Sequence, residues 1–129
     1  MDKKKKRILI VENNMVLSLL YENYMEKMSC TVIDSLVYGK NAVEKVRTTN
    51  PDLIIMDILL DGPMDGIEAM EEIRKFSEVP VIYITGNSDG DKLKRAKATH
   101  YIDFLEKPIS FDHLKEPVEK ALNPVRDNG

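Results

Sequence analysis

Five short apolar runs occur along the chain, separated by longer segments of mixed polarity. Most of the runs are rich in β-branched residues, which is typical of strands covered on both faces, as in a parallel sheet. The pattern predicts five strands, at Ile8–Val11, Thr31–Ile33, Leu53–Met56, Val81–Ile84 and Tyr101–Leu105.

The segments between these runs carry apolar residues at helical spacing. The fourth such segment is polar and offers only Leu93 and Ala96 as apolar contacts, so we expect its helix to be loosely anchored. In the last segment Pro117 predicts either a kink or the start of a new helix. The five predicted helices are Met15–Met28, a shorter one through Ala42–Val46, Gly66–Lys75, Asp91–Lys97 and Phe111–Leu122.

Strands that alternate with helices predict an α/β domain with a parallel sheet and helices on both faces. Right-handed crossovers make such a domain doubly wound. We expect a basic N-terminal tail over residues 1–6, one domain over 7–122 and a disordered tail over 123–129. Ligands of doubly wound domains bind beyond the carboxyl ends of the strands.

Composition narrows the class of protein. The 129 residues are 43% hydrophobic and 32% charged, which fits one soluble domain. A net charge of -3 argues against direct nucleic-acid binding, and we interpret the basic cluster Lys3–Arg7 as a solvated tail. Cys30 is the one cysteine, so no internal disulfide can form, and neither a signal peptide nor an apolar run of about 20 residues is found. We therefore expect a cytoplasmic protein with no membrane partner.

Polar residues follow four of the five predicted strands at their carboxyl ends. They are Glu12-Asn13, Asp57, Thr85 and Lys107. Each has an ordinary explanation by itself, as a helix cap, a turn residue or part of a loop. Because a parallel sheet brings the carboxyl ends of its strands to one edge, their joint occurrence favours a site.

The chemistry of such a site points to phosphoryl transfer. Two neighbouring carboxylates repel each other unless a cation enters, and Mg²⁺ prefers hard oxygen ligands. Asp57 can act as a nucleophile and form an aspartyl phosphate. Lys107 and Thr85 would hold the phosphoryl oxygens together with Mg²⁺.

Across essentially its whole length the chain resembles the receiver domain of bacterial and archaeal response regulators. The resemblance rests on Ile8–Asn13, on Leu53–Asp57 with Met64-Asp65-Gly66, on Val81–Thr85 and on Glu106-Lys107-Pro108. It implies a flavodoxin-like (βα)5 three-layer sandwich with strand order 2-1-3-4-5. It also implies two-component signalling, in which a histidine kinase or phosphotransfer protein donates a phosphoryl group to Asp57.

The same resemblance implies roles for the other residues of the site. Asp57, Glu12, Asn13 and the backbone carbonyl of Leu59 would bind Mg²⁺, and Lys107 would contact the phosphoryl oxygen. Such a domain is a signalling switch rather than an enzyme, although it would assist its own phosphotransfer and dephosphorylation.

The switch itself would involve Thr85, which moves toward the phosphate, and Phe104, which swings inward. This movement would change the face made by the fourth helix, fifth strand and fifth helix. An unknown downstream protein would bind that face, or a second copy would form a homodimer there. Leu59 and Asn87 occupy positions that tune phosphate lifetime in the family.

Asn13 departs from the family pattern, which usually has an aspartate there as a direct magnesium ligand. An amide is neutral, so the charge of the three acidic positions falls from -3 to -2 and we expect weaker Mg²⁺ binding. The alternative is a pseudo-receiver that binds partners without phosphorylation. Both a stand-alone receiver and a piece of a longer regulator remain open.

Two enzyme classes with the same architecture are disfavoured. A haloacid-dehalogenase-like phosphatase needs a second acid two residues after the nucleophile, where this chain has Leu59. A dinucleotide-binding domain needs a glycine-rich turn after the first strand, which Glu12-Asn13-Asn14 does not provide.

Overall fold

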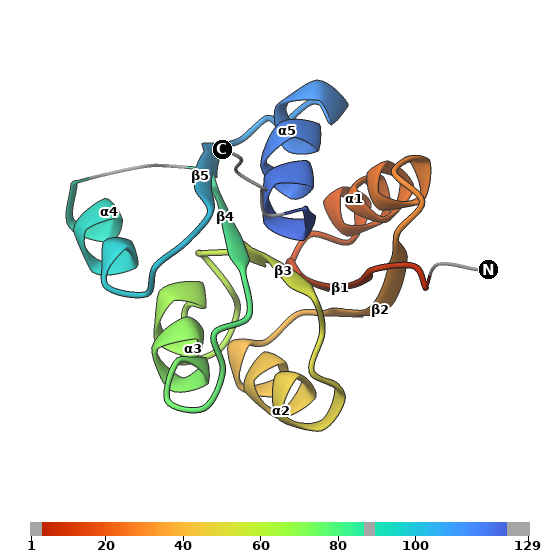
Figure 1. Ribbon diagram of the computed structural model, residues 1–129. Helices are drawn as coiled ribbons and strands as arrows, with labels where there is room; N and C mark the ends of the chain where they lie inside the picture. Colours follow the sequence, from red (N-terminus) through yellow and green to blue (C-terminus); the bar gives the residue numbers. More distant parts are fainter. Residues whose placement is uncertain (1–3, 87–89, 124–129) are drawn as a thin grey trace, which may run out of the picture.

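The computed structural model describes residues 4–86 and 90–123, so Asn87 lies outside the described residues (Figure 1). One parallel sheet has the strand order β2-β1-β3-β4-β5, which confirms the predicted doubly wound topology. Its strands are β1 Arg7–Val11, β2 Thr31–Leu36, β3 Leu53–Asp57, β4 Val81–Thr85 and β5 Asp103–Glu106.

Helices cover both faces of this sheet (Figure 1). On one face lie α1 Met15–Lys27 and α5 Phe111–Leu122. On the other lie α2 Gly39–Thr49, α3 Gly66–Ile73 and α4 Gly90–Lys97. None of the helices in residues 4–86 and 90–123 has the length and apolar character that crossing a bilayer requires.

The alternation of side chains along each strand divides the core in two. Ile8 and Ile10 of β1 pack in the cluster under α1 and α5, whereas Leu9 and Val11 pack in the cluster under α2, α3 and α4. A strand between two helical layers must be apolar on both sides. This requirement explains why β1 and β3 are continuous apolar runs up to their carboxyl ends.

Helix α1 does not bury its most apolar side against the sheet. The apolar residues Val16 and Leu19, which lie at helical spacing, are 75% and 59% exposed. The buried stripe is Ser18, Tyr21 and Met25, whose spacing of three and four residues places them on one face. An apolar surface is therefore left on α1, which begins just after the end of β1.

Two further helices answer questions that the sequence left open. Helix α5 continues through Pro117, whose side chain is buried, so no second helix starts there. Among the residues of α4 only Ala96 is buried, and Arg95 forms an ion pair with Asp65 at 3.2 Å. Helix α4 thus has little apolar contact with the rest of the domain, as predicted.

Candidate functional site

The register of the sheet brings the polar strand ends to one edge. Val11 of β1 is paired with Met56 of β3, so Glu12 and Asp57 are each the next residue along neighbouring strands. Strands β4 and β5 pair through Thr85 and Glu106. The backbone N–H of Lys107 donates to the carbonyl of Thr85 at 2.7 Å, which brings the lysine to the same edge.

Lys107 lies between two buried carboxylates. Its Nζ is 3.1 Å from Oε1 of Glu12 and 3.4 Å from Oδ2 of Asp57. Both acids are only 2% exposed. Two carboxylates share one ammonium group, so the pocket has an excess of one negative charge when all three are ionised.

This excess charge perturbs Asp57. Burial, followed by the charge of Glu12, raises the pKa of Asp57 from 3.8 to about 7, and Lys107 opposes the shift only in part. Beneath the pocket, burial is also the main cause that raises the pKa of Tyr21, with smaller contributions from Glu12 and Asp57. The pocket therefore favours the entry of positive charge.

Its oxygen atoms suit a hard divalent cation. Among the described residues, the fully buried Oε1 of Glu12 has only the ion pair with Lys107, which Glu12 shares with Asp57. Asp57 Oδ1 accepts one weak hydrogen bond, from the N–H of Leu59 at 3.3 Å. No three acidic, histidine or cysteine side chains in residues 4–86 and 90–123 form a metal-binding group by themselves. Mg²⁺ fits two carboxylates because it keeps several waters and accepts neutral oxygen ligands.

Asn13 lies at the exposed rim of this pocket and contacts Asp61, a residue of the loop after β3 that the sequence patterns did not single out as a site residue. Its Nδ2 donates to Oδ1 of Asp61 at 3.2 Å. Neither Glu12 nor Asn13 caps α1, because the side chain of Asn14 accepts from Leu17 N–H. The sequence offered one indirect signal for Asp61. The chain has Asn13 where an acid is usual, and an extra acid stands in the loop after β3.

The other predicted residues lie at or near the same edge. Thr85 is fully buried at the end of β4, and Leu59 is 50% exposed beside Asp57. Phe104 of β5 is half-buried, and its ring centroid is 6.1 Å from that of Tyr83 and 5.8 Å from that of Tyr101. It therefore belongs to an aromatic cluster with Tyr83 and Tyr101, which packs in the same half of the core as Ala96 of α4.

This fold and pocket define a class, the flavodoxin-like α/β domains with an acidic pocket at the carboxyl edge of the sheet. The family model of the response regulator receiver domain matches residues 8–119. The chain therefore belongs to this family, the receiver domains of two-component response regulators. Magnesium and phosphorylation are typical of the family.

Individual relatives agree with the family match. The chain is 29% identical to the response regulator protein VraR of Staphylococcus saprophyticus over 91% of this chain and 56% of VraR. It is 30% identical to the chemotaxis protein CheY of Bacillus subtilis over 91% of this chain and 98% of CheY. The chain thus spans little more than half of VraR but almost all of CheY.

Solved structures agree as well. The receiver domain of a sensor histidine kinase from Pseudomonas aeruginosa superimposes with a TM-score of 0.82 at 26% identity, covering 92% of this chain and 98% of that domain. That structure has a magnesium ion coordinated in its active site cleft.

Proposed function

We propose that the chain is a phosphorylation switch in which Asp57 accepts a phosphoryl group, with Mg²⁺, from a histidine kinase or phosphotransfer protein. The observation that carries this proposal is the position of Lys107 Nζ, within 3.4 Å of both Glu12 and Asp57 in a buried pocket. The magnesium in the related receiver domain from Pseudomonas aeruginosa supports the metal.

The residues of the pocket would divide the chemistry between them. A carboxylate oxygen of Asp57 forms the new bond to phosphorus as the bond from phosphorus to the donor's nitrogen breaks. Lys107 holds Asp57 and neutralises a phosphoryl oxygen, and Thr85 donates a hydrogen bond to another. Bound Mg²⁺, held by Glu12, Asp57, Asn13 and the Leu59 carbonyl, would supply positive charge that stabilises the ionised acids and the phosphoryl group.

The donor in this proposal is a protein. A small open pocket of about 190 Å³ next to the start of α1 is lined by Glu12 and Asn13 and by the apolar side chains of Met15, Leu19 and Val37. Exposed apolar side chains of this kind offer a surface to which a protein donor can dock. Leu59, half-exposed beside Asp57, would shield the acyl phosphate from water and prolong its lifetime.

The output in this proposal is a change in the surface of α4, β5 and α5. As Thr85 moves toward the phosphoryl group, it would leave space next to β5, and Phe104 would change its position within the aromatic cluster that it already forms with Tyr83 and Tyr101. Helix α4, with Ala96 as its buried residue, would shift at small cost. A downstream protein, or a second copy of the chain, would bind the changed face in the cytoplasm.

Incubation with acetyl phosphate and Mg²⁺, followed by intact-protein mass spectrometry, tests the proposal. We expect a mass increase of one phosphoryl group, which disappears in Asp57→Ala. Asp52→Ala is the matched control, because Asp52 lies just before the same strand at its opposite end and bonds to the N–H of Arg7. If no phosphoryl group is added to the unaltered protein, the pseudo-receiver alternative replaces this proposal.

A further inference from the structure

Asp61 lies outside the strand-end residues that define the acidic pocket, yet it contacts one of them. Asn13 follows Glu12 directly and donates its Nδ2 to Oδ1 of Asp61 at 3.2 Å. From this contact we propose that Asp61 is a positioning residue, which orients Asn13 as a neutral metal ligand and supplies the acidic charge that Asn13 lacks. The inference rests on the proposed Mg²⁺ site.

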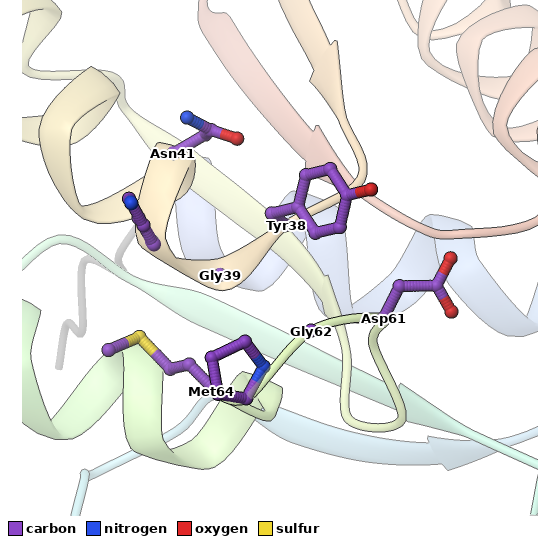
Figure 2. A pocket seen from close by; sticks show the side chains of 8 residues that line it. Tyr38, Gly39, Asn41, Asp61, Gly62 and Met64 are labelled. Carbon is purple, nitrogen blue, oxygen red and sulfur yellow. The ribbon is translucent and has the colours of Figure 1, made fainter.

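Backbone contacts hold Asp61 in place. It forms an isolated parallel β-bridge with Tyr38, and both residues line an open pocket of about 310 Å³ between the loop after β3 and the start of α2 (Figure 2). Gly62, next to Asp61, has a φ of +86°, and a Cβ there would lie 3.2 Å from Tyr38 Cδ1. The loop therefore turns closely under the tyrosine ring, which restricts the backbone from which the exposed Asp61 carboxylate extends toward Asn13.

The carboxylate decides which way the amide of Asn13 faces. An ionised carboxylate only accepts hydrogen bonds, so it can face the NH₂ group of Asn13 but not its carbonyl oxygen. The carbonyl oxygen Oδ1 must then point away from Asp61. It remains available as a neutral oxygen ligand, which is what a site with few carboxylates needs.

A second observation indicates that a cation would be stabilised next to Asn13. The preceding residue, Glu12, is 2% exposed, and among the described residues its Oε1 has only the ion pair with Lys107 at 3.1 Å, an ammonium group that Asp57 shares. Asp61 also changes the charge of the site. Glu12 and Asp57 contribute -2, and Asp61 at the rim makes it -3, the value that three acids would give. Because Asp61 contacts Asn13, its main effect on Mg²⁺ affinity should depend on the residue at position 13.

A double-mutant cycle between positions 13 and 61 tests the inference, with Mg²⁺ affinity measured by titration calorimetry in the absence of any phosphoryl donor. We expect Asp61→Ala to weaken Mg²⁺ binding about tenfold, as the loss of a group that orients a metal ligand typically does. Asn13→Asp should bind Mg²⁺ more tightly than the unaltered protein. In that background Asp61→Ala should weaken Mg²⁺ binding clearly less than it does with Asn13, because an aspartate at position 13 offers oxygen in either orientation and only the charge of Asp61 is lost.

Two further variants separate orientation from charge. Asp61→Asn can still accept from Asn13 through its own carbonyl oxygen, so it should lose less affinity than Asp61→Ala. Asp52→Ala removes the same charge at the opposite end of β3 and should leave Mg²⁺ affinity unchanged. Thermal unfolding without Mg²⁺ should show that every variant is folded.

The outcomes distinguish this inference from the function on which it rests. If Asp57→Ala abolishes Mg²⁺ binding while Asp61→Ala leaves it within about twofold, Asp61 has no positioning role and the proposed site stands. The inference is also overturned if Asp61→Ala weakens binding equally with Asn13 and with Asn13→Asp. Absence of Mg²⁺ binding in the unaltered protein overturns both.

Discussion

At the scale of single residues, Asp57 is destabilised in its ionised form by burial and by the charge of Glu12. It is buried next to Glu12, and Lys107 compensates only one of the two negative charges. The raised pKa of Asp57 is the consequence. A carboxyl group that ionises reluctantly is a poor nucleophile without added positive charge, so the proposed chemistry and the proposed metal depend on each other.

This interaction predicts a pH-dependent loss of stability in the absence of Mg²⁺. The pKa of Asp57 is raised from 3.8 to about 7, so its neutral form stabilises the folded state at low pH, and that contribution is lost as pH rises from about 4 to 7. The shift corresponds to at most about 4 kcal/mol, since one unit is about 1.4 kcal/mol. Asp57→Asn should therefore be more stable than the unaltered protein at pH 8, with a difference that shrinks toward pH 4.

Urea unfolding at several pH values measures this difference, and Mg²⁺ provides the control. The cation should stabilise the unaltered protein at pH 8 more than it stabilises Asp57→Asn. Parallel stability curves for the two proteins between pH 4 and 8 would show that Asp57 ionises normally.

At the scale of elements, the start of α3 determines where Asp57 lies. The N–H of Gly66 donates to the carbonyl of Ile58 at 2.8 Å, and the side chain of Asp65 caps the helix through Glu68 N–H. A Cβ on Gly66 would lie 2.2 Å from the carbonyl oxygen of Asp57. Only glycine allows α3 to approach the end of β3 this closely.

Gly66→Ala should therefore destabilise the domain by about 1–3 kcal/mol, the usual cost of overpacking, and should also slow phosphorylation from acetyl phosphate. Gly90→Ala, at the start of α4, is the matched control. No described atom lies within 4 Å of a Cβ built on Gly90, so we expect no loss of stability and a gain of up to about 1 kcal/mol. Equal effects of the two substitutions on urea unfolding would contradict the close approach.

The strands and helices also show which features of the fold the apolar patterns could predict and which they could not. The apolar runs predicted β1 and β3 because burial on both faces requires continuous apolar residues. The pattern in α1 predicted a helix but not its rotation. Val16 and Leu19 suit a buried stripe as well as Tyr21 and Met25 do, and only packing against the sheet decides between them.

At the scale of the whole molecule, the proposed switch connects the acidic pocket to α4 through Thr85 and Phe104. Strand β4 carries both Tyr83 and Thr85, and Tyr83 is paired with Phe104 in the sheet. In the proposed switch, a movement of Thr85 would reach the aromatic cluster through strand β4, two residues from Tyr83. Helix α4 adjoins this cluster, whereas α2 lies at the other side of the same face of the sheet (Figure 1).

Hydrogen exchange with mass spectrometry tests this connection. Acetyl phosphate and Mg²⁺ should change amide exchange in Gly90–Lys97 and Asp103–Glu106, and should leave Gly39–Thr49 unchanged. Thr85→Ala should still take up the phosphoryl group but lose most of the change in exchange. Thr85→Ser, which keeps the hydroxyl, should retain it. Unchanged exchange in α4 of the phosphorylated protein would remove this route to the output surface.

The amino-acid sequence by itself determined the alternation of strands and helices, and with it the edge at which Glu12, Asp57, Thr85 and Lys107 meet. Those features follow from local apolar patterns and from the rule that parallel strands end at a common edge. Tertiary structure alone decided the raised pKa of Asp57 and the contact between Asn13 and Asp61. Both depend on burial and on distances of a few ångströms between segments far apart in the chain, which no local pattern encodes.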